Sequence, residues 1–360
     1  MQIFNSIAIG GGKNRQSNLE ALRLLSMLMV LNLHSFWGYD HDSGLGQFID
    51  FFRESTSICA VDVFILISGY FGIKWKSKGL FNLLFQCVFY SFAVYAIALA
   101  LGFIDFELKT FLKCFGCFFL SWGFITNYIV LYVISPLINK YSENVSSKNL
   151  LVFIIVLFVA ENTICFTTGI LNFILLYMVG RFLRKTNVVE HVIASSMWRG
   201  YLICTVIITL LAYGFCILTP INNAQLMTMF PLGYSYGSPF IILQAVFIFL
   251  AFAKMTFTNK YINWCASSCL AIFLIHMHPA IKQIGYYSYT ESLYDLPVGQ
   301  HILYLVLLIA GVFFGAILID KIRILISEFV YSVLCKIAIC LPQQAISINT
   351  YIPEQINNLL

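Results

Sequence analysis

The sequence contains repeated apolar runs, each about as long as a helix that crosses a bilayer. A transmembrane helix needs roughly 20 consecutive apolar residues, and by that measure ten candidate segments stand along the chain. They cover residues 19–38, 56–73, 80–103, 120–138, 149–166, 169–185, 198–218, 237–255, 262–281 and 299–319. Hydrophobic residues make up 60% of the chain and charged residues 10%. In a typical soluble domain about 45–50% of residues are apolar and about 25% are charged. The sequence therefore predicts an all-α, polytopic integral membrane protein with about ten transmembrane helices.

The distribution of lysine and arginine predicts how these helices are oriented. With the N-terminus on the cytoplasmic side, only four of the 21 Lys and Arg residues fall on the outer side: Arg53, Lys109, Lys113 and Lys282. Cytoplasmic loops of membrane proteins carry an excess of Lys and Arg, so both termini are predicted to be cytoplasmic. The net charge of +5 then reflects loops beside membrane lipids, and no nucleic-acid partner is expected.

The same segments divide the chain into three parts. Residues 1–18 are predicted to be a cytoplasmic N-terminal lead-in, residues 19–323 a transmembrane domain, and residues 324–360 a cytoplasmic or interfacial tail. The last apolar stretch is interrupted by Glu328 and Lys336, which favours a helix lying in the membrane interface over an eleventh span.

The first apolar segment carries two polar side chains that a plain membrane helix would not need. Arg23 and His34 are eleven residues apart, so at about 100° per residue they point from one face of a helix, about 16 Å apart along its axis. A charged residue at the bilayer centre costs roughly 2.5–3.5 kcal/mol on insertion scales. The pair therefore asks for either a structural or a functional explanation.

Both explanations stay open at this point. In the structural one, Arg23 extends its head group to the inner interface and His34 hydrogen-bonds a neighbouring helix. In the functional one, Arg23 anchors an anionic donor on the inner side and His34 acts as a base further out. Asp62 in the second segment has the same two explanations, and Ser68–Gly69 predict a close helix contact. No metal site is expected, because Cys114 and Cys117 form a C-x-x-C pair without a second pair.

Five stretches resemble, in order, the motifs of the membrane acyltransferase-3 family. RLLSMLMVLNLH resembles the Arg-x10-His signature of the first span, and VDVFILISGYFGIK the phenylalanine-rich second span that ends in Ser-Gly-Tyr. The family's Trp…Tyr…Pro segment is resembled by WGFITNYIVLYVISPLI, and its Gly-then-basic helix end by LLYMVGRFLRK. Its late span, which ends in His-Pro, is resembled by SSCLAIFLIHMHPAI. Two departures stand out: Asn127 occupies the place of a glutamate that longer members carry, and proline follows His278 rather than His276.

The resemblance implies an enzyme of the bacterial cytoplasmic (inner) membrane. Such a protein moves an acyl group, usually acetyl, from cytoplasmic acyl-CoA to a hydroxyl of a cell-surface or lipid-linked glycan such as capsule, O-antigen or exopolysaccharide. The catalytic residues it implies are His34, Arg23 and His276, with His34 as general base or transient acyl carrier. Members with an appended soluble domain are longer, so this chain is expected to act alone or with a separate periplasmic transferase partner.

Basic residues on the predicted inner side suit the phosphates of CoA. They are Arg23, Lys74, Lys76, Lys78 and Arg181. The alternative function is a transporter or flippase of lipid-linked saccharides, or a polymerase of them, in which buried Arg and His would bind a pyrophosphate or relay protons.

Overall fold

The computed structural model describes residues 16–35, 44–115, 123–165, 169–218 and 234–340. The helices follow in chain order: α1 (Ser17–Leu33), α2 (Gly44–Ser55), α3 (Ala60–Phe71), α4 (Ser77–Ala100), α5 (Leu108–Lys113), α6 (Gly123–Asn144), α7 (Ser147–Ala160), α8 (Ile170–Lys185), α9 (Val188–His191), α10 (Ala194–Leu218), α13 (Pro239–Ala253), α14 (Lys260–Ala266), α15 (Cys269–His276), α16 (Ser288–Ser292) and α17 (Val298–Cys340). Short π- and 3₁₀-helical turns are η3 (Glu161–Cys165), η4 (Gln283–Tyr287) and η5 (Leu293–Asp295). The described residues contain no strand, so the all-α prediction is confirmed.

Each apolar segment of the sequence overlaps one helix, except residues 262–281, which overlap the two short helices α14 and α15. Three described helices are long and apolar enough to cross a membrane: α4, α10 and α17. These helices show the membrane character of the chain. The number of ten spans and the cytoplasmic position of both termini stay predictions. Residues 1–15 of the predicted lead-in and residues 341–360 of the predicted tail lie outside the described residues.

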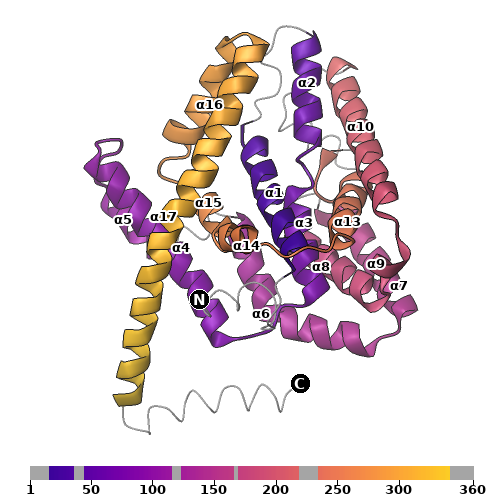
Figure 1. Cartoon of the computed structure of the whole chain (residues 1–360), viewed down its shortest axis with the longest axis horizontal. Helices are drawn as coiled ribbons and strands as arrows, with labels where there is room; N and C mark the ends of the chain where they lie inside the picture. Colours follow the sequence, from indigo (N-terminus) through magenta and orange to yellow (C-terminus); the bar gives the residue numbers. More distant parts are fainter. Residues whose placement is uncertain (1–15, 36–43, 116–122, 166–168, 219–233, 341–360) are drawn as a thin grey trace.

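The helices form a bundle with one long helix along its side. α1, α3 and α8 lie centrally, α7, α10 and α13 flank them on one side, and α4, α5 and α17 on the other (Figure 1). α17 is a single helix of 43 residues, about 64 Å long at about 1.5 Å per residue, and its lower end extends beyond the bundle (Figure 1). The domain boundary predicted at residue 323 falls inside this helix, so the tail begins as its direct continuation.

A buried ion pair within α17 accepts hydrogen bonds from side chains of α4. Arg323, 2% exposed, lies 2.8 Å from the fully buried carboxylate of Asp320. Tyr90 of α4 donates to the same carboxylate at 2.8 Å and Gln86 at 3.4 Å. A buried charge is tolerated when it is paired and hydrogen-bonded, and this network satisfies both charges. It thereby fixes the middle of α17 against α4.

Two glycines allow α3 and α8 to touch along their backbones. A Cβ atom on Gly180 would lie 2.5 Å from the carbonyl oxygen of Leu66 and 2.7 Å from the amide of Tyr70, and one on Gly69 would meet the backbone of Tyr177. Small residues at helix crossings permit this close approach in membrane proteins. The contact places α3, and the cavity side chains it carries, at a fixed distance from α8.

We expect Gly180→Ala to destabilise the protein by about 1–3 kcal/mol, the usual cost of overpacking a filled interior. The backbone atoms that the new methyl group would meet cannot rotate away. Thermal unfolding of the detergent-purified protein measures the effect, with Gly311→Ala on α17, where nothing lies within 4 Å, as the matched control. Equal melting temperatures for the two variants would contradict the close packing of α3 on α8.

Candidate active site

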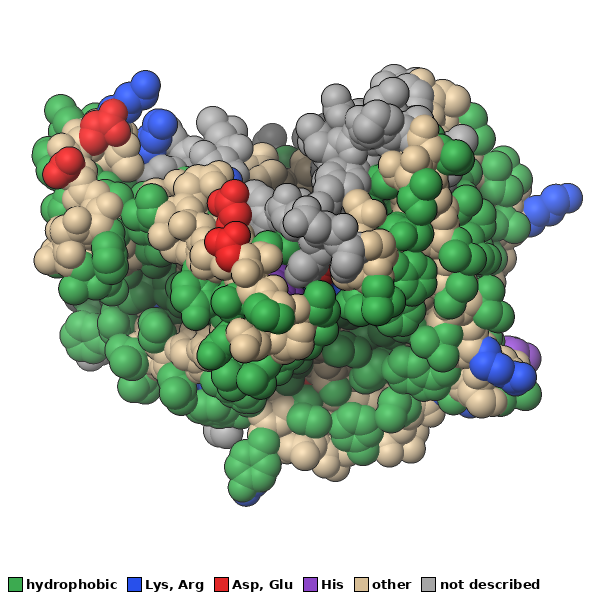
Figure 2. Space-filling model, turned by 90° about the horizontal axis from the view of Figure 1, so that it is seen from above, with side chains coloured by type: hydrophobic (Ala, Val, Ile, Leu, Met, Phe, Trp, Pro, Cys, Tyr) green, Lys and Arg blue, Asp and Glu red, His purple; other side chains and the backbone are tan. Residues whose placement is uncertain are grey.

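An apolar cavity of about 350 Å³ lies between α1, α3, α4, α6 and the α14–α15 pair. Arg23 and His34 both line it, together with Met27, Val30 and Leu33 of the same helix. These positions recur every three or four residues, so one face of α1 forms a wall of the cavity. Seen from above, the molecule is hollowed, and histidine atoms are visible within the hollow (Figure 2).

At one end of the cavity, the guanidinium of Arg23 makes few interactions with other side chains. Its guanidinium lies 3.7 Å from the carboxylate of Glu20, and no hydrogen bond from it is found among the described residues. Gln86, Ser267 and Cys269 also line the cavity. An arginine that faces a cavity with uncommitted N–H groups is suited to bind an anionic ligand.

His34 and His276 meet near the opposite end of α1. The Nδ1 atom of His34 lies 2.8 Å from the Nε2 atom of His276, and the two rings are 5.1 Å apart between centroids. His276 is the last residue of α15 and is 5% exposed. Phe273 and Tyr287 pack their rings against His34. The pair thus joins residues 242 positions apart in the sequence at the cavity wall.

The hydrogen bonds of this pair assign its tautomers. The Nδ1 atom of His276 lies 2.6 Å from the carbonyl oxygen of Ile272, and a carbonyl can only accept, so this nitrogen carries a proton. In a neutral imidazole the other nitrogen is then an acceptor, so His276 Nε2 accepts a hydrogen bond from His34 Nδ1. The neutral form is the one expected for a side chain buried without a counter-ion. His34 is left with an unprotonated Nε2, which is the form of a base.

The second histidine of the late motif has a different place. The Nε2 atom of His278 lies 3.2 Å from the carbonyl oxygen of Ser91 on α4, and its Nδ1 accepts from the amide of Ala280. The first contact joins the turn after α15 to α4, and the second lies within that turn. The structure pairs His34 with His276 and not with His278.

The four other basic residues singled out in the sequence do not line the cavity. Lys74 and Lys76 are exposed in the connection between α3 and α4, and Lys78 lies over the ring of Tyr331, 4.4 Å from its centroid. Arg181 of α8 donates to Glu143 at 2.9 Å and to Ser142 at 3.0 Å. Arg181 also lies beside Gly72, the residue that follows α3.

Asp62 is fully buried and neither carboxylate oxygen has a hydrogen-bond partner among the described residues. It is not among the residues that line the cavity. We therefore assign Asp62 no role in the site.

The sequence did not point to the polar cluster at the C-terminal end of α1. Arg53 of α2 reaches Asn32 and Ser35, on either side of His34. Burial raises the pKa of the neighbouring Glu54 to about 8, although Tyr234 and Arg53 oppose the shift. The only signal in the sequence was that Arg53 is one of few cations on the predicted outer side.

Two tyrosines of the 285–294 loop also have roles that their positions alone did not reveal. Tyr286 donates to the carbonyl oxygen of Leu31 at 2.7 Å, and Tyr294 contacts Arg53 at 3.1 Å. Both are buried. Tyr286 thus contacts α1 directly, and Tyr294 contacts both Arg53 of α2 and the carbonyl oxygen of Ser35 just after α1.

The fold and the cavity define a class: a helical membrane protein with a buried base at one end of an apolar cavity and an arginine at the other. The sequence matches the acyltransferase domain of the acyltransferase-3 family over residues 16–321. The chain belongs to this family and is a membrane acyltransferase. Neither the curated proteins nor the solved structures give a significant match to this chain.

Proposed function

We propose that this protein transfers an acyl group, most simply acetyl, from acyl-CoA to a hydroxyl of a glycan. The single observation that carries the proposal is the cavity that Arg23 and His34 both line, with His34 held in the base form by His276. One substrate extended along this cavity would contact an anion-binding group and a base about 16 Å apart.

In the proposed reaction, Nε2 of His34 takes the proton of the acceptor hydroxyl while its oxygen attacks the thioester carbonyl. The tetrahedral intermediate expels the CoA thiolate, the C–S bond breaks, and the proton passes from His34 to sulfur. The products are an O-acyl glycan and free CoA. General base catalysis of this kind contributes roughly 10²–10⁴ in rate. Attack by His34 itself, giving an acyl-imidazole that the hydroxyl then resolves, uses the same nitrogen.

The donor would enter from the predicted cytoplasmic side. Arg23 lines the cavity and has N–H groups to offer a phosphate or pantetheine carbonyl. Lys74, Lys76, Lys78 and Arg181 lie outside the cavity, so we assign them to the nucleotide end of CoA, which remains at the membrane surface. The apolar wall between Arg23 and His34 suits the pantetheine arm and excludes water from the thioester.

The acceptor would approach His34 from the opposite side, as a lipid-linked or cell-surface glycan. We place the protein in a bacterial inner membrane on the positive-inside pattern and on the family to which it belongs. Membrane lipids surround it, and a separate periplasmic transferase is a possible second partner. The flippase and polymerase alternatives are less well supported, because the family model that matches residues 16–321 is that of an acyltransferase domain.

We expect Arg23→Lys to weaken acyl-CoA binding about tenfold. The substitution keeps the charge but loses the planar fork, and hydrogen bonds to charged groups contribute about 1.5–3 kcal/mol. Donor affinity is measured by titration of the purified protein. The transfer rate is measured separately at saturating donor, and this rate should remain close to wild type. Arg199→Lys is the matched control, because Arg199 is exposed and its hydrogen bonds within the described part of the chain go to Ser195 and Ser196 of its own helix turn. Unchanged donor affinity in Arg23→Lys would remove Arg23 from the donor site.

A further inference from the structure

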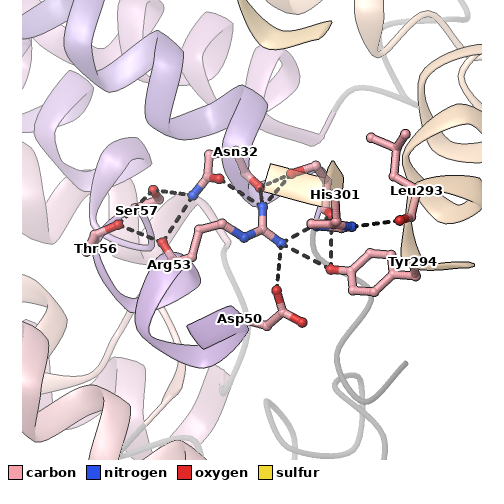
Figure 3. Close-up of polar contacts among 9 residues, drawn as sticks. Asn32, Asp50, Arg53, Thr56, Ser57, Leu293, Tyr294 and His301 are labelled. Atoms are coloured by element: carbon pink, nitrogen blue, oxygen red, sulfur yellow. Dashed lines mark hydrogen bonds and ion pairs between the residues drawn. The ribbon is translucent and has the colours of Figure 1, made fainter. Parts of the chain in front are cut away.

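The last turn of α1 is held by an arginine from the neighbouring helix. α1 ends at Leu33, so His34 is its C-terminal cap residue. The guanidinium of Arg53 donates from one nitrogen to Asn32 Oδ1 at 2.9 Å and to Ser35 Oγ at 2.7 Å. Its other terminal nitrogen donates to the hydroxyl of Tyr294 at 3.1 Å. Figure 3 shows this cluster, in which side chains from three parts of the chain converge on one guanidinium.

The contacts run in both directions between α1 and α2. The amide nitrogen of Asn32 donates to the carbonyl oxygen of Arg53 at 3.0 Å and to Ser57 Oγ at 2.8 Å. Asp50, one turn before Arg53 on α2, lies 3.6 Å from the guanidinium and balances its charge. Hydrogen bonds thus run from Arg53 to Asn32 and from Asn32 back to Arg53, and they join the C-terminal ends of α1 and α2.

The position of Arg53 also suits the electrostatics of a helix end. The last carbonyl groups of a helix lack partners within it, and a cation there interacts favourably with the helix dipole. The carbonyl oxygens of Asn32 and Ser35 each lie 3.4 Å from the guanidinium. With Tyr286 bonded to Leu31, residues on both sides of His34 are fixed by neighbours, while the His34 side chain is left to contact His276.

We propose that Arg53 is a positioning residue for His34. It holds the last turn of α1 so that His34 Nδ1 stays within hydrogen-bond distance of His276, which keeps Nε2 unprotonated. Arg53 contacts neither substrate in this proposal and acts through Asn32 and Ser35. The consequence for the reaction rate rests on the proposed function, whereas the consequence for the tautomer of His34 does not.

The tautomer can be observed directly. Purified protein labelled with ¹⁵N-histidine gives imidazole nitrogen resonances that distinguish protonated from unprotonated Nε2, and loss of one set in His34→Gln assigns the residue. We expect wild-type His34 to show protonated Nδ1 and unprotonated Nε2. In Arg53→Gln we expect this signature to be replaced by a mixture of tautomers, and acyl transfer to fall about 10²-fold, the scale of loss for a displacement of about 1 Å.

Three comparisons make the test decisive. Acyl-CoA affinity should stay within about twofold in Arg53→Gln, because the donor end of the cavity lies at Arg23. Arg53→Lys should restore part of the signature and rate, since one ammonium can reach Asn32 or Ser35 but cannot span to Tyr294 as the fork does. Arg199→Gln, an exposed arginine on α10, should change neither the spectrum nor the rate.

Each remaining outcome decides the proposal. A wild-type His34 signature in Arg53→Gln overturns it, whether transfer is lost or retained. If wild-type protein transfers no acyl group, the proposed function fails, but the spectra still decide the role of Arg53. If Arg53→Gln does not fold, Tyr294→Phe removes one acceptor of the guanidinium; we then expect a partial loss of the signature and a several-fold slower transfer, and an unchanged signature would overturn the proposal.

Discussion

Replacement of His34 by alanine should stop acyl transfer while the protein still binds acyl-CoA. The imidazole is the group that takes and returns the hydroxyl proton, so its removal should lower the rate by roughly 10²–10⁴. Arg23, on the same wall of the cavity but about 16 Å away along α1, remains in place to hold the donor. Donor affinity should therefore stay within about threefold of wild type.

The measurement needs binding and transfer to be followed separately on the same purified protein. Binding is followed by titration with a non-hydrolysable acyl-CoA analogue, and transfer by appearance of free CoA thiol in the presence of a saccharide acceptor. His191→Ala serves as the matched control, because His191 is exposed and, among the described residues, its hydrogen bond goes to Asn187 in its own turn. Transfer at the wild-type rate in His34→Ala would leave His34 as a structural contact between helices.

Replacement of His276 should have the second largest effect. Without the acceptor nitrogen of His276, the proton of His34 is free to move to Nε2, which then cannot act as a base. Fixing the tautomer of a catalytic histidine is worth up to about 10⁴ in enzymes with a Ser-His-Asp triad, and we expect His276→Ala to lose at least about 10² in transfer rate. His276→Gln should retain more activity, because its amide oxygen can accept the hydrogen bond from His34 Nδ1.

The comparison with His278 separates the two histidines of the late motif. His278 bonds the backbone of α4 and of its own turn, so His278→Ala should lower the melting temperature but leave the transfer rate per folded molecule near wild type. The opposite pattern, with transfer lost only in His278→Ala, would show that the motif histidine acts from a position other than the one the structure gives it.

The sequence was most informative where a physical constraint acts along the chain. Apolar runs of about 20 residues dictate helices in lipid because every backbone group must be satisfied within its segment. Each run overlaps one helix of the described residues, apart from 262–281, which overlaps the two short helices α14 and α15. The shared face of Arg23 and His34 also follows from helix geometry alone, and the cavity lies on that face.

The sequence was least informative about partners that lie far apart in the chain. Nothing in the apolar stretch around His276 shows that it meets His34, 242 residues away, and the resemblance left His278 as a rival. Arg53 belongs to no apolar run, and its bonds to α1 depend on how α2 folds back over the end of that helix. Arg323 counted as an inner-side cation, yet it is buried against Asp320, because its pairing depends on α4 packing beside α17.

The central claim is that one CoA, bound from the cytoplasmic side at Arg23, reaches His34. A thiol placed at the far end of the cavity tests this, because a thiolate attacks a disulfide only when the two come into contact. The variant carries His34→Cys together with Cys269→Ser, which removes the thiol that lines the cavity. It is prepared in sealed membrane vesicles of either orientation, and CoA disulfide, which does not cross membranes, is added outside. Peptide mass spectrometry then locates the CoA adduct. We predict an adduct at position 34 when CoA disulfide is added on the cytoplasmic side and not on the other, and much less of it when Arg23→Ala is included. Reaction of position 34 with a small methanethiosulfonate but not with CoA from the cytoplasmic side would contradict the claim.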